Sequence, residues 1–175
     1  MASKGRHAHV LAPCQVVLVR PRYPENLGAA ARAMRVTGFD QLVLVAPHEL
    51  ADPAHPQARK LAVGSTELLD QALVVDSLDD VLRNIDVSVA TSARPGVSNI
   101  ASPRQLSTRL LEEASAGKRM ALIFGGERAG LRRAEVDACD IVCRIPMVAN
   151  EPSMNLAQAV MVVLYELLVA AFDRG

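Results

Sequence analysis

The end of the chain decides the fold. A segment rich in proline and polar residues leads there into an almost wholly apolar segment, 157–172. The first of the two reads Ile145-Pro146-Met147-Val148-Ala149-Asn150-Glu151-Pro152-Ser153-Met154-Asn155-Leu156. The pattern predicts the end of a strand, a loop and a long helix. Because this helix is apolar on nearly every side, we expect the core or a partner subunit to enclose it. Ser153 and Asn155 are residue types that cap helices, and their loop offers polar groups to a ligand.

Upstream of this stretch, short apolar runs alternate with helical patterns. The alternation predicts an α/β fold with a mostly parallel six-stranded sheet and helices on both faces. Residues 1–14 are expected to form an N-terminal tail, and residues 15–175 a single domain. We expect the first helix to end at Gly38. The predicted strands are 15–19, 41–46, 72–75, 87–90, 120–124 and 141–145, and the predicted helices are 26–36, 58–63, 77–82, 103–116, 133–138 and 157–172.

The composition fits one domain of this class. The chain has 175 residues, half of them hydrophobic and only 3% aromatic, so its core must be built from Val, Leu, Ala, Ile and Met, as in parallel sheets. Basic and acidic residues balance at 19 each. The overall charge therefore gives no pull toward nucleic acid or an anionic membrane, and any polyanion must be held by local groups.

Cysteine usage and the two ends of the chain indicate a cytoplasmic protein. Cys14, Cys139 and Cys143 form no CxxC pair and the four histidines form no HExxH pattern, so we expect a reducing compartment and no metal site. The polar N-terminus lacks the apolar run of a signal peptide. The last helix is shorter than about 20 residues and contains Gln158 and Glu166, which makes it a poor membrane span. We expect no membrane partner.

Four polar or glycine-rich turns follow strands of the predicted sheet, at 20–26, 91–94, 125–130 and 146–155. Ligands of open parallel sheets collect at the carboxyl ends of the strands. The four turns therefore predict a ligand site along one edge of the sheet.

Each turn taken alone also has a plain structural explanation. The glycine loop 125–130 matches neither GxGxxG nor GxxxxGK[ST], so by itself it indicates only a turn. Asn26 could cap the helix that follows it, and Arg32, about 240° further around that helix, could lie on the surface. Arg94 could face solvent, and the loop before the last helix could serve only to cap it.

Three motifs in order carry more information than any one of them. Together they closely resemble the SPOUT-class RNA 2′-O-ribose methyltransferases, and among these the TrmJ branch of the TrmH family, whose members methylate tRNA. The resemblance spans about residues 15–172. Its motifs are Asn26-Leu27-Gly28-Ala29-Ala30-Ala31-Arg32 with Gly38, then Phe124-Gly125-Gly126-Glu127-Arg128-Ala129-Gly130, then Ile145-Pro146-Met147 with Ser153-Met154-Asn155-Leu156.

The resemblance implies a fold and a reaction. It implies a trefoil knot in the C-terminal third, which the general rarity of threaded chains argues against, and a pocket for S-adenosylmethionine formed by the knot loops. It also implies a homodimer through the C-terminal helix, which the apolar surface of that helix favours independently. The implied activity is transfer of a methyl group to a ribose 2′-hydroxyl of RNA, with tRNA as the expected substrate.

The family's site residues carry over position by position. Because arginine stays protonated at neutral pH, we expect Arg32 to hold the ribose hydroxyl and a neighbouring phosphate, with the proton leaving to that phosphate or to water. Glu127 and Asn155 would order the pocket. The polar catalytic set would be Arg32, Asn26, Glu127, Ser153 and Asn155, and the cofactor would be bound by Thr91, Ser92, Ala93, Gly125, Gly130, Ile145, Met147, Pro152, Ser153, Met154 and Leu156.

Two other functions fit the same motifs. One is a ribosomal RNA 2′-O-methyltransferase, and the other is a non-enzymatic RNA-binding dimer of the same fold. Three departures from the TrmJ pattern leave the RNA target open. Gly126 stands where an arginine is frequent, Thr37 stands where an asparagine is frequent, and the C-terminal extension usual in that branch does not follow Phe172. Either the RNA target differs or the extension has been removed from this sequence.

Overall fold

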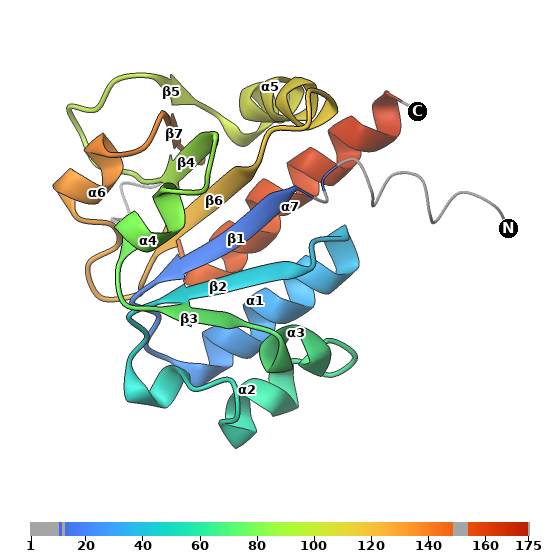
Figure 1. Cartoon of the computed structure of the whole chain (residues 1–175), viewed down its shortest axis with the longest axis vertical. Coiled ribbons are helices and arrows are strands. Elements are labelled where there is room, and N and C mark those ends of the chain that lie inside the picture. Colours follow the sequence, from blue (N-terminus) through green and yellow to red (C-terminus); the bar gives the residue numbers. More distant parts are fainter. Residues whose placement is uncertain (1–10, 12, 149–153, 175) are drawn as a thin grey trace, which may run out of the picture.

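Seven parallel strands form one sheet around which the helices are arranged (Figure 1). The structure is a computed structural model that describes Leu11 and residues 13–148 and 154–174. The strand order is β3-β2-β1-β6-β4-β7-β5, and all of these pairings are parallel. The strands are β1 (Cys14–Val19), β2 (Gln41–Val45), β3 (Leu73–Val75), β4 (Val87–Thr91), β5 (Ile100–Ala101), β6 (Met120–Gly125) and β7 (Ile141–Cys143).

The number of strands differs from the prediction. Six were expected, but a seventh, β5, lies within residues 95–102, which the sequence pattern left irregular. It is two residues long and pairs with β7 at the edge of the sheet. Ile100 is 44% exposed, so β5 has no buried apolar run that would predict a strand. The α/β class and the parallel sheet are confirmed.

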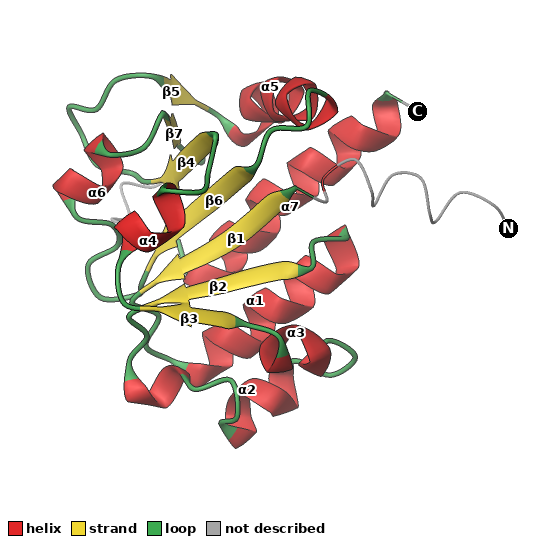
Figure 2. Ribbon diagram, in the orientation of Figure 1, coloured by secondary structure: helices red, strands yellow, loops and turns green. Residues whose placement is uncertain are grey.

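Helices cover both faces of the sheet, as predicted (Figure 2). Alternate residues of β1 point to opposite faces. Val16 and Leu18 pack in one cluster with α1, α2, α3, α5 and α7, whereas Val17 and Val19 pack with α4 and α6. The helices are α1 (Pro24–Thr37), α2 (Pro56–Leu61), α3 (Thr66–Asp70), α4 (Leu78–Leu82), α5 (Pro103–Ser115), α6 (Arg133–Asp137) and α7 (Leu156–Asp173), with a 3-10 turn η2 (Glu49–Ala51).

The first helix, α1, begins earlier than predicted. It starts at Pro24, because proline is favoured in the first turn, where its missing N–H leaves no intrahelical hydrogen bond unmade. Tyr23 is the N-cap residue, so the interpretation of Asn26 as a cap is wrong. Asn26 is the third helical residue, and its N–H donates to the carbonyl oxygen of Tyr23 at 3.1 Å. The helix ends at Thr37, and Gly38 forms the left-handed cap, as predicted.

The last helix, α7, is long and apolar, as predicted, and Asn155 is its N-cap residue. It packs against α1, α5 and β6 and buries Leu164 and Leu167 completely. Its other side is open within this chain, because Met161 is 38% exposed and Tyr165 is 56% exposed. By length and composition alone α7 could also cross a membrane, but its packed face makes it part of the core on one side of the sheet.

Candidate active site at the strand ends

A cavity of about 570 Å³ opens at the carboxyl ends of β4 and β6, at the edge where the turns predicted a site. Cavities that hold small ligands and cofactors measure roughly 300–1,000 Å³. Its walls come from the ends of β4 and β6, the segment after β7 and the start of α7. They consist of Thr91, Ser92, Ala93, Arg94, Pro95, Phe124, Gly125, Gly126, Glu127, Arg128, Ala129, Gly130, Leu131, Ile145, Met147, Met154, Leu156 and Ala159.

Most residues expected to bind the cofactor meet in these walls, although they come from four separate segments of the chain. Two of the expected residues, Pro152 and Ser153, lie outside the described residues. The expected residues that line the cavity are Thr91, Ser92, Ala93, Gly125, Gly130, Ile145, Met147, Met154 and Leu156.

In the structure the glycine loop extends by one residue, to 125–131, and Gly125 and Gly126 lie so close to neighbouring backbone that side chains are excluded at both positions. The N–H of Gly126 donates to the last carbonyl oxygen of β1 at 2.8 Å. A Cβ atom at Gly126 would overlap the backbone carbonyl of Arg20, and one at Gly125 would overlap the backbone of Gly130. The arginine that is frequent at position 126 in the TrmJ pattern would therefore fit here only if the turn after β1 moved.

Three of the expected catalytic residues form a hydrogen-bonded network beside the cavity. Asn26 Nδ2 donates to Glu127 Oε1 at 3.0 Å, and Asn155 Nδ2 donates to Asn26 Oδ1 at 2.9 Å. The Glu127 carboxylate also accepts the backbone N–H groups of Arg22, at 2.8 Å, and Tyr23, at 3.2 Å. Glu127 thus lies at the N-terminus of α1, where the helix dipole favours a negative charge.

Asn155 joins this network to the start of α7. Its Oδ1 accepts the backbone N–H groups of Ala157, at 3.0 Å, and Gln158, at 3.2 Å, which is the hydrogen-bonding pattern of an N-cap. Its Nδ2 serves Asn26 at the same time. One side chain therefore begins α7 and links it to α1.

Arg32 stands apart from this network. It is exposed on α1 and is not among the residues that line the cavity. It stands six positions after Asn26, which places it about 9 Å further along the helix axis. Within residues 13–148 and 154–174 its side chain makes no hydrogen bond or ion pair, which leaves the guanidinium group available to a partner outside this part of the chain.

One residue of the cavity wall carries a polar atom whose hydrogen-bonding capacity is unused. Thr91 Oγ1 is buried and has no hydrogen-bond partner among the described residues. Buried polar groups are normally paired, so this hydroxyl is available to a polar group of a ligand. Gly125 leaves the neighbouring wall without a side chain, and Met147 and Leu156 add apolar surface. A hydroxyl group, open backbone and apolar walls fit an adenosine-containing ligand such as S-adenosylmethionine.

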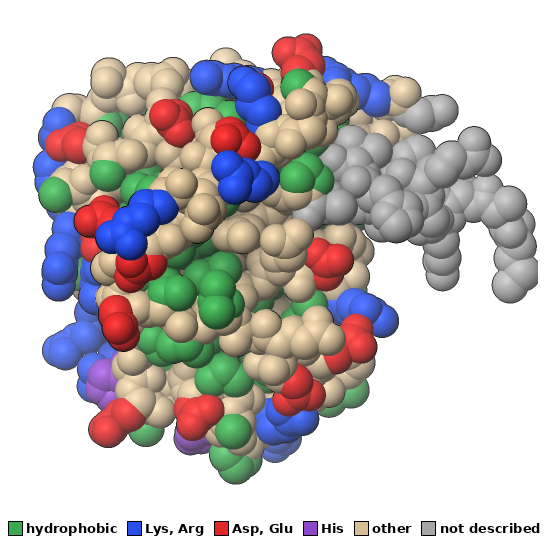
Figure 3. Space-filling model, in the orientation of Figure 1, with side chains coloured by type: hydrophobic (Ala, Val, Ile, Leu, Met, Phe, Trp, Pro, Cys, Tyr) green, Lys and Arg blue, Asp and Glu red, His purple; other side chains and the backbone are tan. Residues whose placement is uncertain are grey.

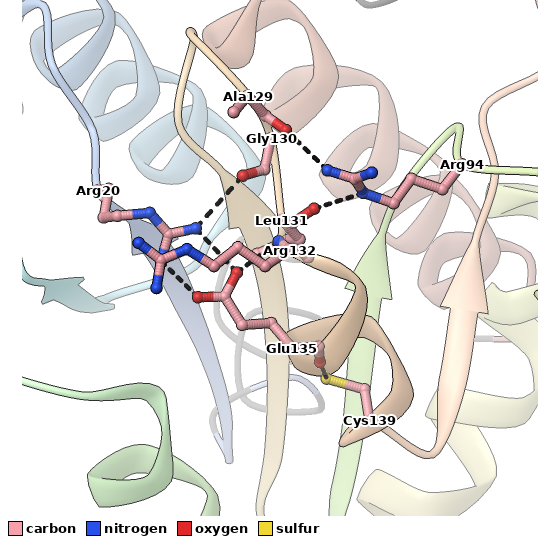
Figure 4. Close-up of polar contacts among 8 residues, drawn as sticks. All are labelled: Arg20, Arg94, Ala129, Gly130, Leu131, Arg132, Glu135 and Cys139. Atoms are coloured by element: carbon pink, nitrogen blue, oxygen red, sulfur yellow. Dashed lines mark hydrogen bonds and ion pairs between the residues drawn. The ribbon is translucent and has the colours of Figure 1, made fainter.

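Arg94 has a structural role that was not predicted from the sequence. This residue is half-buried and lines the cavity instead of facing solvent. Its Nε donates to the carbonyl oxygen of Leu131 at 2.6 Å, and its Nη2 donates to that of Ala129 at 3.3 Å (Figure 4). Arg144 Nη2 in turn donates to the carbonyl oxygen of Arg94. The available signal was its place directly after the expected cofactor residues 91–93.

On the other side of the glycine loop, Arg20 pairs with Glu135 of α6 (Figure 4). Arg20 Nη1 bonds Glu135 Oε1, and Nη2 donates to Oε2 at 2.8 Å and to the carbonyl oxygen of Gly130 at 3.4 Å. Burial of the Glu135 carboxyl opposes its ionisation, but hydrogen bonds from Arg20 and from the N–H of Arg132 outweigh it and lower its pKa. The same pairing raises the pKa of Arg20.

Basic and acidic side chains are mixed on the left side of the molecule in Figure 3, which is the side where the strands end in Figure 1.

Comparisons with known proteins give one family. Residues 13–165 match the model described as the SpoU rRNA Methylase family. The tRNA (cytidine/uridine/adenosine-2′-O-)-methyltransferase TrmJ of Pseudomonas aeruginosa (strain UCBPP-PA14) is 41% identical over 158 residues, which are 89% of this chain and 60% of that protein. The chain spans 60% to 66% of the length of such curated relatives.

Solved structures agree with this match. The structure of Probable Methyltransferase from Bordetella pertussis Tohama I aligns with a TM-score of 0.87 at 30% identity, covering 94% of this chain and 99% of that one. TrmJ from Z. mobilis ZM4 aligns with a TM-score of 0.80 at 34% identity, covering 88% of this chain and 67% of that one.

Proposed function

The chain belongs to the SpoU rRNA Methylase family, and from this we propose that it is an S-adenosylmethionine-dependent methyltransferase that acts on a ribose 2′-hydroxyl of tRNA. The observation that carries the proposal is the network of Asn26, Glu127 and Asn155 at the rim of a cofactor-sized cavity. Relatives at 36% to 41% identity bear the name tRNA 2′-O-methyltransferase, which favours tRNA over other RNA.

The protein's part in the reaction is to hold two reactants in line. When bound, S-adenosylmethionine would supply the methyl group for the ribose 2′-oxygen, and the hydroxyl proton would leave to phosphate or water. Thr91 and Gly125 would hold the cofactor from the strand ends, and Met154 and Leu156 would hold it from the segment that begins α7.

Arg32 contacts the RNA instead of the cofactor. Its guanidinium group is exposed, and a protonated guanidinium binds phosphate through two parallel hydrogen bonds. Glu127 and Asn155 have a different task. The Glu127 carboxylate already accepts three hydrogen bonds, so it fixes the turn after β1 against the glycine loop. Asn155 fixes α7 against α1.

The enzyme works as a homodimer through α7. Met161 and Tyr165 are exposed, and Leu168 and Val169 are half-buried. Their spacing of three and four residues puts them in one apolar stripe along the helix. A second copy of the same helix would cover this stripe and remove it from water, which is the arrangement that a two-fold symmetric interface provides.

The proposal extends to the course of the chain. The C-terminal third forms a trefoil knot, the chain from β1 to α7 is a single catalytic domain, and the enzyme meets its tRNA in the cytoplasm. The domain includes Cys14, which was expected to lie in the tail but is the buried first residue of β1. Two features support the knot. The strands β6 and β7 insert at interior positions of the sheet instead of extending its edges. The last helix returns to pack against α1, near the start of the chain.

The proposed function is tested by incubating the protein with methyl-labelled S-adenosylmethionine and either bulk tRNA or ribosomal RNA, followed by nuclease digestion and mass spectrometry. We expect labelled 2′-O-methyl nucleotides in tRNA, and their loss in Arg32→Ala with cofactor binding retained. Methylation of ribosomal RNA alone would contradict the substrate. Cofactor binding without methylation of either RNA, or no cofactor binding, would contradict the proposed activity.

A further inference from the structure

Three consecutive carbonyl groups of the glycine loop are held by two arginine side chains that approach from opposite sides (Figure 4). The carbonyl oxygens of Ala129 and Leu131 accept hydrogen bonds from Arg94, and that of Gly130 accepts one from Arg20. All three carbonyls belong to residues that line the cavity. The backbone of this wall is therefore fixed by groups outside the loop itself.

Arg20 is itself held firmly in place. Its φ of 52° lies in the left-handed region, which a non-glycine residue adopts at a cost of about 1 kcal/mol or more, and which persists where the surroundings impose it. Its backbone N–H donates to the carbonyl oxygen of Val45 at 2.8 Å, and its guanidinium group forks onto Glu135. Arg20 does not line the cavity, so it reaches the wall only from behind.

Arg94 ties the same loop to the other walls. Its side chain holds the glycine loop, and its backbone N–H donates to Ser92 Oγ at 3.1 Å. Its carbonyl oxygen accepts a hydrogen bond from Arg144. Three wall segments, after β4, β6 and β7, are thus joined through this one residue.

We propose that Arg20 and Arg94 form a two-sided clamp that sets residues 129–131 in the shape that binds the cofactor, and that Arg20, paired with Glu135, is a positioning residue for cofactor binding. The inference rests on the proposed function, in that the ligand is the methyl donor. A loop with glycines at 125, 126 and 130 has wide conformational freedom by itself. Fixing it before binding removes an ordering cost that the ligand would otherwise bear.

The clamp predicts a specific defect in Arg20→Ala. Without the guanidinium group, the loop must be ordered by the ligand itself, so the Kd for S-adenosylhomocysteine, measured by calorimetry, should rise about tenfold. The KM for S-adenosylmethionine should rise with it, whereas kcat at saturating cofactor should change little. Backbone amides of residues 126–131 should also exchange with deuterium faster in the unliganded variant, a readout that needs no cofactor.

A matched control separates this effect from the loss of any ion pair. Arg119 pairs with Asp86 through Nε–Oδ2 at 3.2 Å and Nη2–Oδ1 at 3.3 Å, at the amino ends of the strands. Arg119→Ala should leave the Kd within about twofold of wild type. Arg20→Lys keeps the charge but lacks the fork, and should recover only part of the affinity. If Arg20→Ala does not fold, Glu135→Gln, which removes the charge of the partner at constant size, replaces it.

The outcomes distinguish this inference from the proposed function. If wild type binds S-adenosylhomocysteine and Arg20→Ala, folded, binds it within twofold and exchanges its loop amides at the wild-type rate, the clamp is refuted and the function stands. An equal loss in Arg119→Ala would also refute the clamp. If wild type binds no S-adenosylhomocysteine, the proposed function fails, and the amide exchange alone decides whether Arg20 orders the loop.

Discussion

Asn155→Ala should lower both stability and activity, because this side chain caps α7 and joins it to the network of Asn26 and Glu127 that we propose to be catalytic. Loss of an N-cap costs about 1 kcal/mol, and loss of one exposed amide–amide hydrogen bond costs about 0.5 kcal/mol, since water partly replaces it. The sum of about 1.5 kcal/mol corresponds to a fall in Tm of about 3–6 °C for a domain of this size. Asn155→Asp separates the two roles. Its carboxylate still caps the helix and suits the helix dipole, but it has no proton to donate to Asn26.

The assay combines thermal melts followed by circular dichroism with methyl transfer to tRNA. We expect Asn155→Ala to melt lower and to lose activity, and Asn155→Asp to melt near wild type and still lose activity. If Asn155→Ala melts within 1 °C of wild type, the cap contributes less than about 0.5 kcal/mol and the first step of the reasoning is wrong. Full methyl transfer by Asn155→Asp would refute the link to Asn26.

Four further results are expected. Leu164→Ala removes a fully buried side chain and should cost about 2–5 kcal/mol, with dimerisation in sedimentation and cofactor binding in calorimetry falling together; independent behaviour would contradict their linkage through α7. Tyr165→Asp should yield a folded monomer, and an intact dimer would exclude this stripe as the interface. The folded-state pKa of Glu135 lies below its ordinary 4.5. The stability advantage of wild type over Glu135→Gln should therefore be complete above pH 4.5 and should disappear in melts as the pH falls through the folded-state pKa. Burial raises the pKa of Cys14 and Cys143 to about 12, so neither thiol should react with a thiol reagent at pH 8 before unfolding.

The elements that could be predicted from the sequence are those whose own residues form a recognisable apolar run. The strands β1 and β6 are central and buried on both faces, so their residues read as continuous apolar runs. The edge strand β5 has two residues and depends on pairing with β7, which no local pattern encodes. The start of α1 was misplaced by giving Asn26 the cap position, although Pro24 carries the stronger signal.

The candidate site divides in the same way. The motifs predicted that Thr91, Gly125 and Leu156 share one site, and all three line the cavity. They meet because the strand order brings the segments that carry them to the carboxyl-end edge of the sheet. The place of Arg94 after residues 91–93 indicates that it lies near the site. The carbonyl groups that Arg20 and Arg94 hold could not be predicted, because a guanidinium group bound to a backbone carbonyl leaves no trace in the partner's residue type. The carbonyl oxygens that accept hydrogen bonds from Arg94 belong to residues 35 and 37 positions further along the chain.

The network of Asn26, Glu127 and Asn155 also has a kinetic consequence. Its two side-chain hydrogen bonds span 101 and 129 residues, so they close only after distant parts of the chain have met. Contacts of such separation form late, because loop-closure entropy must be overcome first. During refolding from denaturant, helical circular dichroism should therefore return before S-adenosylhomocysteine binding does. The return of ligand binding would then measure the rate at which α7 docks onto α1, and it would mark the last step of folding.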